Sequence, residues 1–456
     1  MLFAAVMFSG LVRFLLQGWV DTLYVQPTFF FHYDGFSWVR VWPEWGIYLH
    51  YALLMLLALF IGVGFMYRLS CALFFLAFSY LQLMDVSNYL NHYYLVALLA
   101  LLLCFLPAHH CWSVDAWLFP KLREDRVAAW TIYLLRFQIA LVYLYAALAK
   151  VNSDWLLYAQ PLGLWMGART HLPIIGPFLG APWVAYLLSW AGFLYDASIV
   201  FWLSWRRSRP FAYLVVLAFH AMTYVFFSIG MVPFIMSSVT LIFFSPSWPR
   251  ILLQRMRRFF PKASKRVEPR SFAMDSGAIR APAWTLHRRL GAMALLAYLV
   301  FQTVFPLRHF AYPGNVLWNE EGMRFAWKVM VREKNGSITY FVQPRGRLSA
   351  RSSGASTAKK RYQVSPHDYL TFRQAQEMSS QPDLIVKLAE HIADDFQRRG
   401  FGAVDVYAEA LVSLNGRAPA LLLDPSVDLS KGSAALKGKD WILPEPNTAP
   451  IRLASR

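Results

Sequence analysis

The residues best suited to chemistry in this sequence lie around one lysine at the end of an apolar run. Lys150 closes the hydrophobic part of the stretch Leu141 to Trp155, and polar residues follow it at once. At helical spacing Arg136, Tyr143 and Lys150 recur every seven residues, so they fall near one face of the segment. Two roles are open for Lys150. Its ammonium group can reach a membrane interface while its stem lies in lipid, or burial can make it a partly desolvated amine that acts as a general base.

A second polar group lies between two earlier apolar segments. Asp85 ends one segment, and Asn91 and His92 open the next. A carboxylate near a histidine can tune and orient the imidazole, while an amide can hold a carbonyl or hydroxyl group. An interfacial belt of aromatic, asparagine and histidine residues is the alternative that these residues leave open.

The remaining candidates are weaker when taken alone. His309 lies just past the last apolar segment, and Trp318 begins a charged, aromatic cluster that is more typical of a domain junction than of a site. At His220, inside an apolar segment, we expect a satisfied buried histidine. The three cysteines form no CxxC pair or His/Cys cluster with metal-ligand spacing, so we expect no metal site.

The composition is that of a polytopic α-helical membrane protein. Of the 456 residues 57% are hydrophobic and only 15% are charged, which is too apolar for an ordinary soluble protein. The net charge of +18 comes from basic residues that collect in short segments between apolar runs. We interpret them as topology signals and contacts for anionic lipid, and we expect no nucleic acid partner.

About eight or nine apolar segments are candidates to cross a bilayer. They cover residues 3–20, 46–66, 69–86, 93–106, 128–149, 183–204, 211–228, 231–244 and 290–306, and the fourth and eighth are short enough to be re-entrant. The positive-inside rule then predicts a cytoplasmic N-terminus and an extracytoplasmic chain after Pro306. This topology brings the polar candidates to the same outer membrane face: Asp85, Asn91, His92, Lys150, Arg169 and His309.

Two domains follow from this topology. Residues 1–306 form a transmembrane helical catalytic domain with a basic cytoplasmic loop at 250–289, and residues 307–456 form a small extracytoplasmic α+β domain packed on the active-site face. In this second domain we expect strands at 324–331 and 336–343 around a turn at Asn335-Gly336, and helices at 366–376 and 382–399. A further hairpin joins 404–414 to 418–423 around Asn415-Gly416.

Several short motifs occur in an order that resembles a known family. They are NxxNHxYL from Asn88 to Leu95, a run ending in Asp154-Trp155, then FHxM, FSIGM from Phe227 to Met231, SPxWPR from Ser245 to Arg250, and PxxHF. Each motif is weak, but their shared order and spacing are similar to those of the vitamin K-dependent gamma-glutamyl carboxylases. The resemblance covers almost the whole chain and leads us to expect a compact homologue that lacks the long C-terminal region of those enzymes.

The resemblance implies a lyase that uses reduced vitamin K. Family members oxidise the hydroquinone with O2 to the 2,3-epoxide, and couple this epoxidation to removal of a glutamate γ-proton and addition of CO2. The expected partners are a glutamate-containing peptide or protein and membrane lipid. By resemblance Lys150 is the catalytic lysine, His92 an essential histidine and His309 a second functional histidine. The implied binding residues are Asn91, Tyr143 and Asp85 at the quinone, and Arg169 and Trp318 at the glutamate. Arg136 is a further candidate binding residue that the helical spacing alone indicates.

The chain also departs from the family pattern. Ala149 stands where the animal enzymes have a lysine, Asn152 replaces an acidic residue, and Tyr89 replaces a tryptophan. Two alternatives to a full carboxylase therefore stay open. The first is a quinol epoxidase without carboxylation, and the second is a non-enzymatic membrane protein that binds quinone or lipid.

Overall fold

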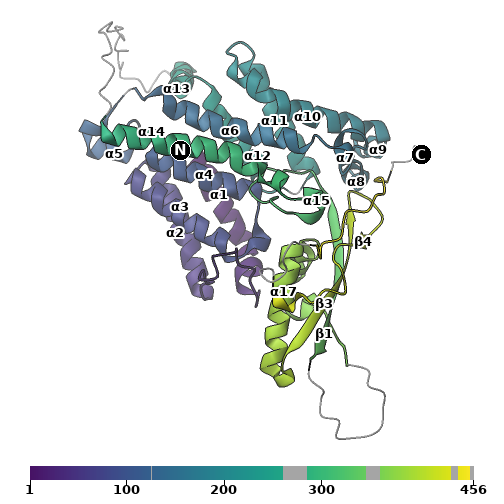
Figure 1. Cartoon of the computed structure of the whole chain (residues 1–456). Coiled ribbons are helices and arrows are strands. Elements are labelled where there is room, and N and C mark those ends of the chain that lie inside the picture. Colours follow the sequence, from purple (N-terminus) through teal and green to yellow (C-terminus); the bar gives the residue numbers. More distant parts are fainter. Residues whose placement is uncertain (125, 228, 260–284, 346–359, 433–439, 452–456) are drawn as a thin grey trace, which may run out of the picture.

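The chain folds into a bundle of apolar helices from which a sheet with two helices projects (Figure 1). The computed structural model describes the chain except residues 125, 228, 260–284, 346–359, 433–439 and 452–456. Most of the basic loop predicted at 250–289 therefore lies outside the described residues. The long helices of the bundle are α1 (Leu2–Leu16), α2 (Glu44–Val63), α3 (Tyr67–Met84), α4 (Asn91–Phe105), α6 (Ala129–Ala149), α10 (Pro182–Ser204), α11 (Arg209–Phe226), α12 (Val232–Val239), α13 (Trp248–Phe259) and α14 (Leu286–Val304).

Shorter helical turns connect these elements. The α-helical ones are α5 (Val114–Leu118), α7 (Ser153–Leu156), α8 (Leu162–Gly167), α9 (Gly176–Leu179) and α15 (Val316–Asn319). The others are η1 (Asp21–Val25), η2 (Val86–Asn88), η3 (Pro120–Leu122), η4 (Thr240–Phe243) and η6 (Phe305–Ala311).

Six helices in the described part of the chain are long and apolar enough to cross a membrane, or seven if a bent pair is counted as one span. The predicted count of eight or nine is not confirmed, although each predicted segment contains a helix. The 15 residues of α1 and of α4 each rise about 22 Å, which is less than the roughly 30 Å of a bilayer core. The eighth segment breaks after η4, where α13 turns away by 99°.

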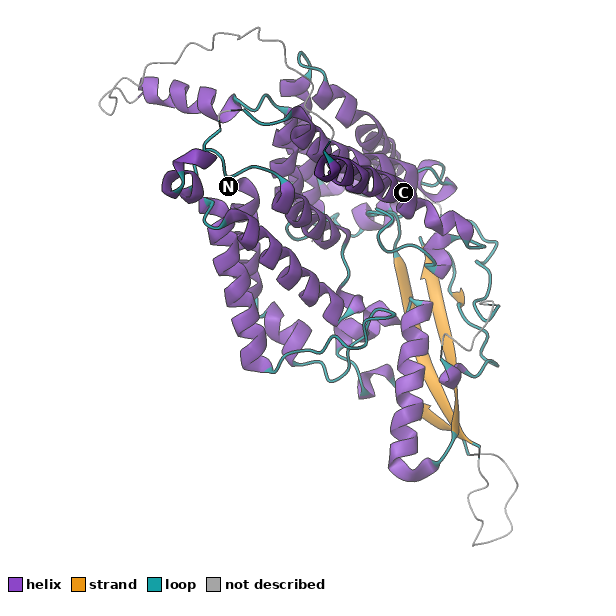
Figure 2. Ribbon diagram, turned by 60° about the vertical axis from the view of Figure 1, so that its left-hand side comes forward, coloured by secondary structure: helices purple, strands orange, loops and turns teal. Residues whose placement is uncertain are grey.

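The C-terminal part contains one antiparallel sheet with strand order β2-β1-β3-β4. Its strands are β1 (Lys334–Pro344), β2 (Tyr362–Val364), β3 (Val404–Leu414) and β4 (Ala420–Leu421), and the long β1–β3 pair runs from Lys334 opposite Leu414 to Pro344 opposite Val404. Helices α16 (Phe372–Met378) and α17 (Pro382–Phe396) follow β2, with η7 (Pro366–Asp368), η8 (Gln397–Phe401) and η9 (Leu429–Lys431) beside them. We call this part the sheet module. Figure 2 shows α17 lying along the sheet, where the alternate buried residues of β3 pack.

The hairpin predicted around Asn335-Gly336 is wrong, because both residues lie inside β1 and residues 324–331 form no strand. Gly336 is needed for a close approach rather than for a turn. A Cβ at this position would lie 2.6 Å from the carbonyl oxygen of Ser379. The second predicted hairpin is confirmed, since β3 and β4 pair around Asn415 and Gly416, both of which have positive φ.

Two sets of polar contacts attach the sheet module to the helical bundle. In the first, the loop after η1 bonds to the module: Gln374 donates to the Phe29 carbonyl at 2.8 Å, and Lys387 donates to the His32 carbonyl at 2.6 Å. The second is a buried ion pair in which the Arg417 guanidinium binds both carboxylate oxygens of Asp154 at 2.6 and 2.7 Å. Because Asp154 lies four residues after Lys150, this ion pair fixes the loop that follows the lysine.

Candidate active site

A cavity of about 590 Å³ lies within the helical bundle and ends against residues of the C-terminal part. Its wall is mostly apolar, with side chains from α1, α4, α6, α10, α11 and α12. Trp327, Met330 and Arg373 contribute from beyond the last helix of the bundle. A cavity of this size and character can hold a ring system with a hydrophobic tail.

Lys150 lies in this cavity as one half of a buried ion pair. Its Nζ is 2.7 Å from Oδ2 of Asp196 on α10, and the two side chains are 7% and 8% exposed. The same nitrogen donates to the Ala146 carbonyl at 3.2 Å and lies 5.2 Å from the centre of the Trp155 ring. The chain turns directly after the lysine because the Asn152 side chain accepts the Trp155 amide at 2.9 Å and caps α7.

Tyr143 lines the cavity near Lys150, and Tyr195 lies behind it. The Tyr143 hydroxyl, two helical turns before Lys150, lies 3.3 Å from the Tyr195 hydroxyl, and Tyr195 is the neighbour of Asp196 on α10. The Tyr195 ring stacks on Phe219 with 3.9 Å between centroids. Helices α6 and α10 therefore hold a lysine, a carboxylate and two phenols together.

The predicted Asn91 and His92 also line the cavity, from the first turn of α4. Asn91 accepts the Tyr89 hydroxyl at 3.0 Å and donates to the Lys328 carbonyl at 3.2 Å, which fixes the segment that carries Trp327 and Met330. The His92 ring has no hydrogen-bond partner among the described residues, so both of its ring nitrogens are available to a ligand.

Asp85 does not line the cavity. It is completely buried at the end of α3, where its Oδ2 accepts Gln374 of α16 at 2.9 Å and its Oδ1 accepts the Ser87 amide at 2.9 Å. Burial raises the pKa of this carboxyl group despite these hydrogen bonds. Its place indicates a role in joining the bundle to the sheet module rather than a direct contact with a ligand.

The structure places three other predicted residues outside the cavity wall. Arg136 donates to the carbonyl groups of Ile242 and Phe243 at 3.0 and 3.1 Å, at the end of η4. Arg169 donates to the Phe226 carbonyl at 3.1 Å. His309 shares its Nδ1 with the Pro306 carbonyl at 2.9 Å.

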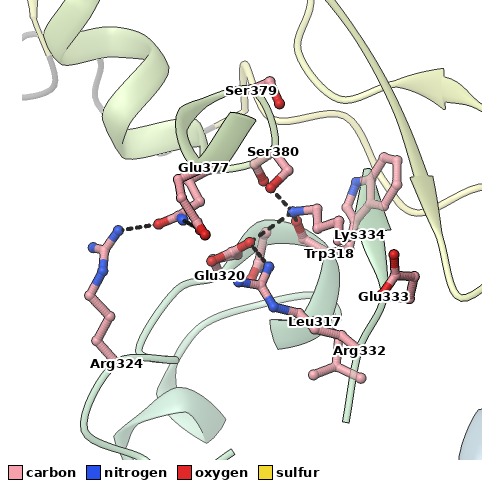
Figure 3. A network of polar contacts seen from close by, with 12 residues as sticks. Leu317, Trp318, Glu320, Arg324, Arg332, Glu333, Lys334, Glu377, Ser379 and Ser380 are labelled. Carbon is pink, nitrogen blue, oxygen red and sulfur yellow. Dashed lines mark hydrogen bonds and ion pairs between the residues drawn. The ribbon is translucent and has the colours of Figure 1, made fainter. Parts of the chain in front are cut away.

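Trp318 also lies away from the cavity, in a polar network at the base of the sheet module (Figure 3). Its indole nitrogen donates to the Leu443 carbonyl at 2.8 Å. Lys334 bonds to the Trp318 and Ser380 carbonyls and lies 3.2 Å from Glu320, as Figure 3 shows. Burial lowers the pKa of Lys334 to about 8, although Glu320 acts in the opposite direction. This network secures the packing of the module.

Sequence reasoning missed three charged residues of the cavity wall, Arg13, Asp196 and Arg373, and gave His220 only a structural role. An aspartate inside an apolar helix is a strong functional signal, and this signal was present for Asp196. His220 is not the satisfied histidine expected, since neither ring nitrogen has a partner among the described residues. Those residues also contain no group of three or more His, Cys, Asp or Glu side chains placed to hold a metal ion.

Two family models match the chain. A model described as the HTTM domain matches residues 1–248, and a model described as the vitamin K-dependent gamma-carboxylase, lumenal domain, matches residues 287–448. The first covers most of the helical bundle with the cavity, and the second covers α14 and the sheet module. No solved structure matches the chain.

Proposed function

Because the chain belongs to the vitamin K-dependent gamma-carboxylase family, we propose that it oxidises vitamin K hydroquinone with O2 to the 2,3-epoxide and carboxylates peptidyl glutamate. The observation that carries this proposal is the Lys150–Asp196 pair at the polar end of an apolar cavity. The apolar wall suits the quinone ring and tail. The polar end suits the hydroxyl group that must lose its proton.

Lys150 is the base in this proposal, and Asp196 assists it. In a buried pair neither charge is well solvated, so a proton can pass from Lys150 to Asp196 along their 2.7 Å contact. The neutral amine then takes the proton of the quinol hydroxyl. A positioned general base accelerates such a step by about 10²- to 10⁴-fold.

The neighbouring side chains orient the ligand and keep water out. The hydroxyl group of Tyr143, which contacts the Tyr195 hydroxyl, and the free nitrogens of His92 offer hydrogen bonds to the quinol oxygens. A glutamate γ-proton is too weakly acidic for a side chain to remove directly. A water-poor wall therefore matters, because it protects the strong base that the oxidation provides.

We place the N-terminus in the cytoplasm and the sheet module on the extracytoplasmic side. The support is the positive-inside rule, applied to the basic loops that precede α6 and α11. A peptide substrate would then reach the cavity from the aqueous side, past the sheet module, and the quinone would enter from lipid.

The test supplies purified protein with vitamin K hydroquinone, a glutamate-containing peptide and labelled bicarbonate. Epoxide and acid-stable peptide label, both lost in Lys150→Ala, would support the full reaction. Epoxide without label would reduce the proposal to a quinol epoxidase. If neither product forms, the protein is a quinone- or lipid-binding member of the family.

A further inference from the structure

The cavity wall carries more positive than negative charge. Its described residues include the cations Arg13, Lys150 and Arg373 and a single carboxylate, Asp196. The wall offers the two arginines no carboxylate of their own, because Asp196 is paired with Lys150. Glu377, one turn after Arg373 on α16, interacts with the Arg373 charge but does not line the cavity. Cations that face an apolar cavity favour a ligand that brings a counter-charge.

Arg13 belongs to α1, inside the bundle. Its guanidinium lies over the Trp19 ring at 4.9 Å from the ring centre, and the described residues offer it no carboxylate partner. This arrangement leaves the donor groups of Arg13 free to turn into the cavity. Arginine is expensive to place in a membrane helix and is found there chiefly for function.

Arg373 approaches the same cavity from the sheet module. It forms no hydrogen bond or ion pair with a described residue, yet the helix turn that carries it is firmly held. The adjacent Gln374 donates to the Asp85 carboxylate at 2.9 Å and to the Phe29 carbonyl at 2.8 Å, and it forms a capping box with Thr371. The buried Asp85 is thereby a positioning residue for Arg373.

The two guanidinium groups converge although 360 residues separate them in the chain. Both line the cavity, and the charge of each acts on the same Tyr93 hydroxyl. By contrast Arg169, which resemblance assigns to the substrate carboxylate, is held by the Phe226 carbonyl and lies outside the wall.

We propose that Arg13 and Arg373 form a clamp for the carboxylates of the peptide side chain. This inference rests on the proposed function and assigns the part of the site that holds the peptide. The glutamate side chain brings one carboxylate, and addition of CO2 to its γ-carbon leaves two carboxylates on that carbon. Two guanidinium groups match this dianion, since each binds a carboxylate through a pair of parallel hydrogen bonds.

Binding without turnover is the first test. A peptide containing γ-carboxyglutamate should bind the purified protein more tightly than its glutamate counterpart, and the glutamine counterpart should bind most weakly. Arg13→Gln and Arg373→Gln should each weaken the two acidic peptides by about 10- to 100-fold and leave the glutamine peptide unchanged. Arg398→Gln is the matched control, because Arg398 is an exposed arginine of the same module. Equal binding of the three peptides by the wild type would overturn the clamp.

Kinetics separates this clamp from the proposed function. The two glutamine variants should raise the KM of the glutamate peptide and leave the KM of the hydroquinone unchanged. Arg13→Lys and Arg373→Lys should raise the KM of the glutamate peptide less than the glutamine variants do, because lysine keeps the charge but not the paired hydrogen bonds. A raised hydroquinone KM with an unchanged peptide KM would assign the arginines to the quinol and refute the clamp. If the wild type forms no epoxide, the proposed function is refuted. The order in which the three peptides bind still tests the clamp independently.

Discussion

Removing Arg417 should release the loop that follows Lys150. The Arg417 side chain is 9% exposed and its partner Asp154 is 6% exposed, and two short hydrogen bonds join them. Asn415 adds a third bond to the same carboxylate at 2.9 Å. Arg417→Ala leaves the Asp154 charge buried with only this amide donor. Loss of one member of a buried ion pair destabilises by about 3–5 kcal/mol.

Native-state hydrogen exchange measures this effect where it arises. The amides of Asn152, Trp155 and Leu156 are hydrogen-bonded within the loop. Their protection in Arg417→Ala should fall by roughly two to three and a half orders of magnitude, up to the limit set by global unfolding. Turnover should fall too, because the same loop fixes Lys150.

The control and the double variant make the reasoning refutable. Arg345 also pairs with two carboxylates, but its side chain is 45% exposed, so Arg345→Ala should change stability by less than about 1 kcal/mol. Changing both partners, in Arg417→Met with Asp154→Asn, should recover part of the lost protection because the buried Asp154 charge is gone, while Glu445, which is 22% exposed, still loses its contact with Arg417. If Arg417→Ala behaves like Arg345→Ala, the ion pair does not hold the loop.

Three other outcomes are expected. Asp196→Asn should lower kcat for epoxide formation by about 10²- to 10³-fold with little change in KM, because Lys150 loses its proton acceptor; wild-type turnover in correctly folded Asp196→Asn protein would contradict this role. The free energy of unfolding should rise by up to about 3 kcal/mol between pH 8 and 10.5, because Lys334 has released its proton in the folded protein and still holds it in the unfolded chain. Thermal unfolding measured against pH should not show this rise in Lys334→Met. Gly336→Ala should lower the stability by about 1–3 kcal/mol in denaturant unfolding, since its Cβ meets the Ser379 carbonyl, and a neutral effect would argue against the close approach.

Much of the bundle could be predicted from sequence, because apolar runs report helices directly. Each predicted apolar segment contains a helix, and the polar ends that carry Asn91, His92 and Lys150 meet in one cavity. The number of crossings could not be predicted in the same way. Whether a short apolar helix spans, bends or stops depends on its packing partners, as the bend after η4 shows.

The limits of the site prediction have physical causes. The seven-residue spacing predicted one helix face for Arg136, Tyr143 and Lys150. Tyr143 and Lys150 both line the cavity, but Arg136 lies about 21 Å from Lys150 along the helix and outside the cavity wall. A seven-residue repeat predicts which residues share a helix face, but it does not predict where along the helix a cavity lies. Arg373 could not be found this way, because it stands on a polar helix that only tertiary docking brings to the cavity.

The contacts between the loop after η1 and the sheet module also determine when this loop can fold during synthesis. Thr28, Phe29 and His32 bond to residues that lie 341 to 355 positions further along the chain. At about 5–20 residues per second, the ribosome needs roughly 20 to 70 s to supply those partners. During this interval Phe31, which is fully buried in the finished protein, has no module to pack against. The bundle can therefore enter the membrane early, but Arg373 reaches the cavity only after the sheet module has been synthesised.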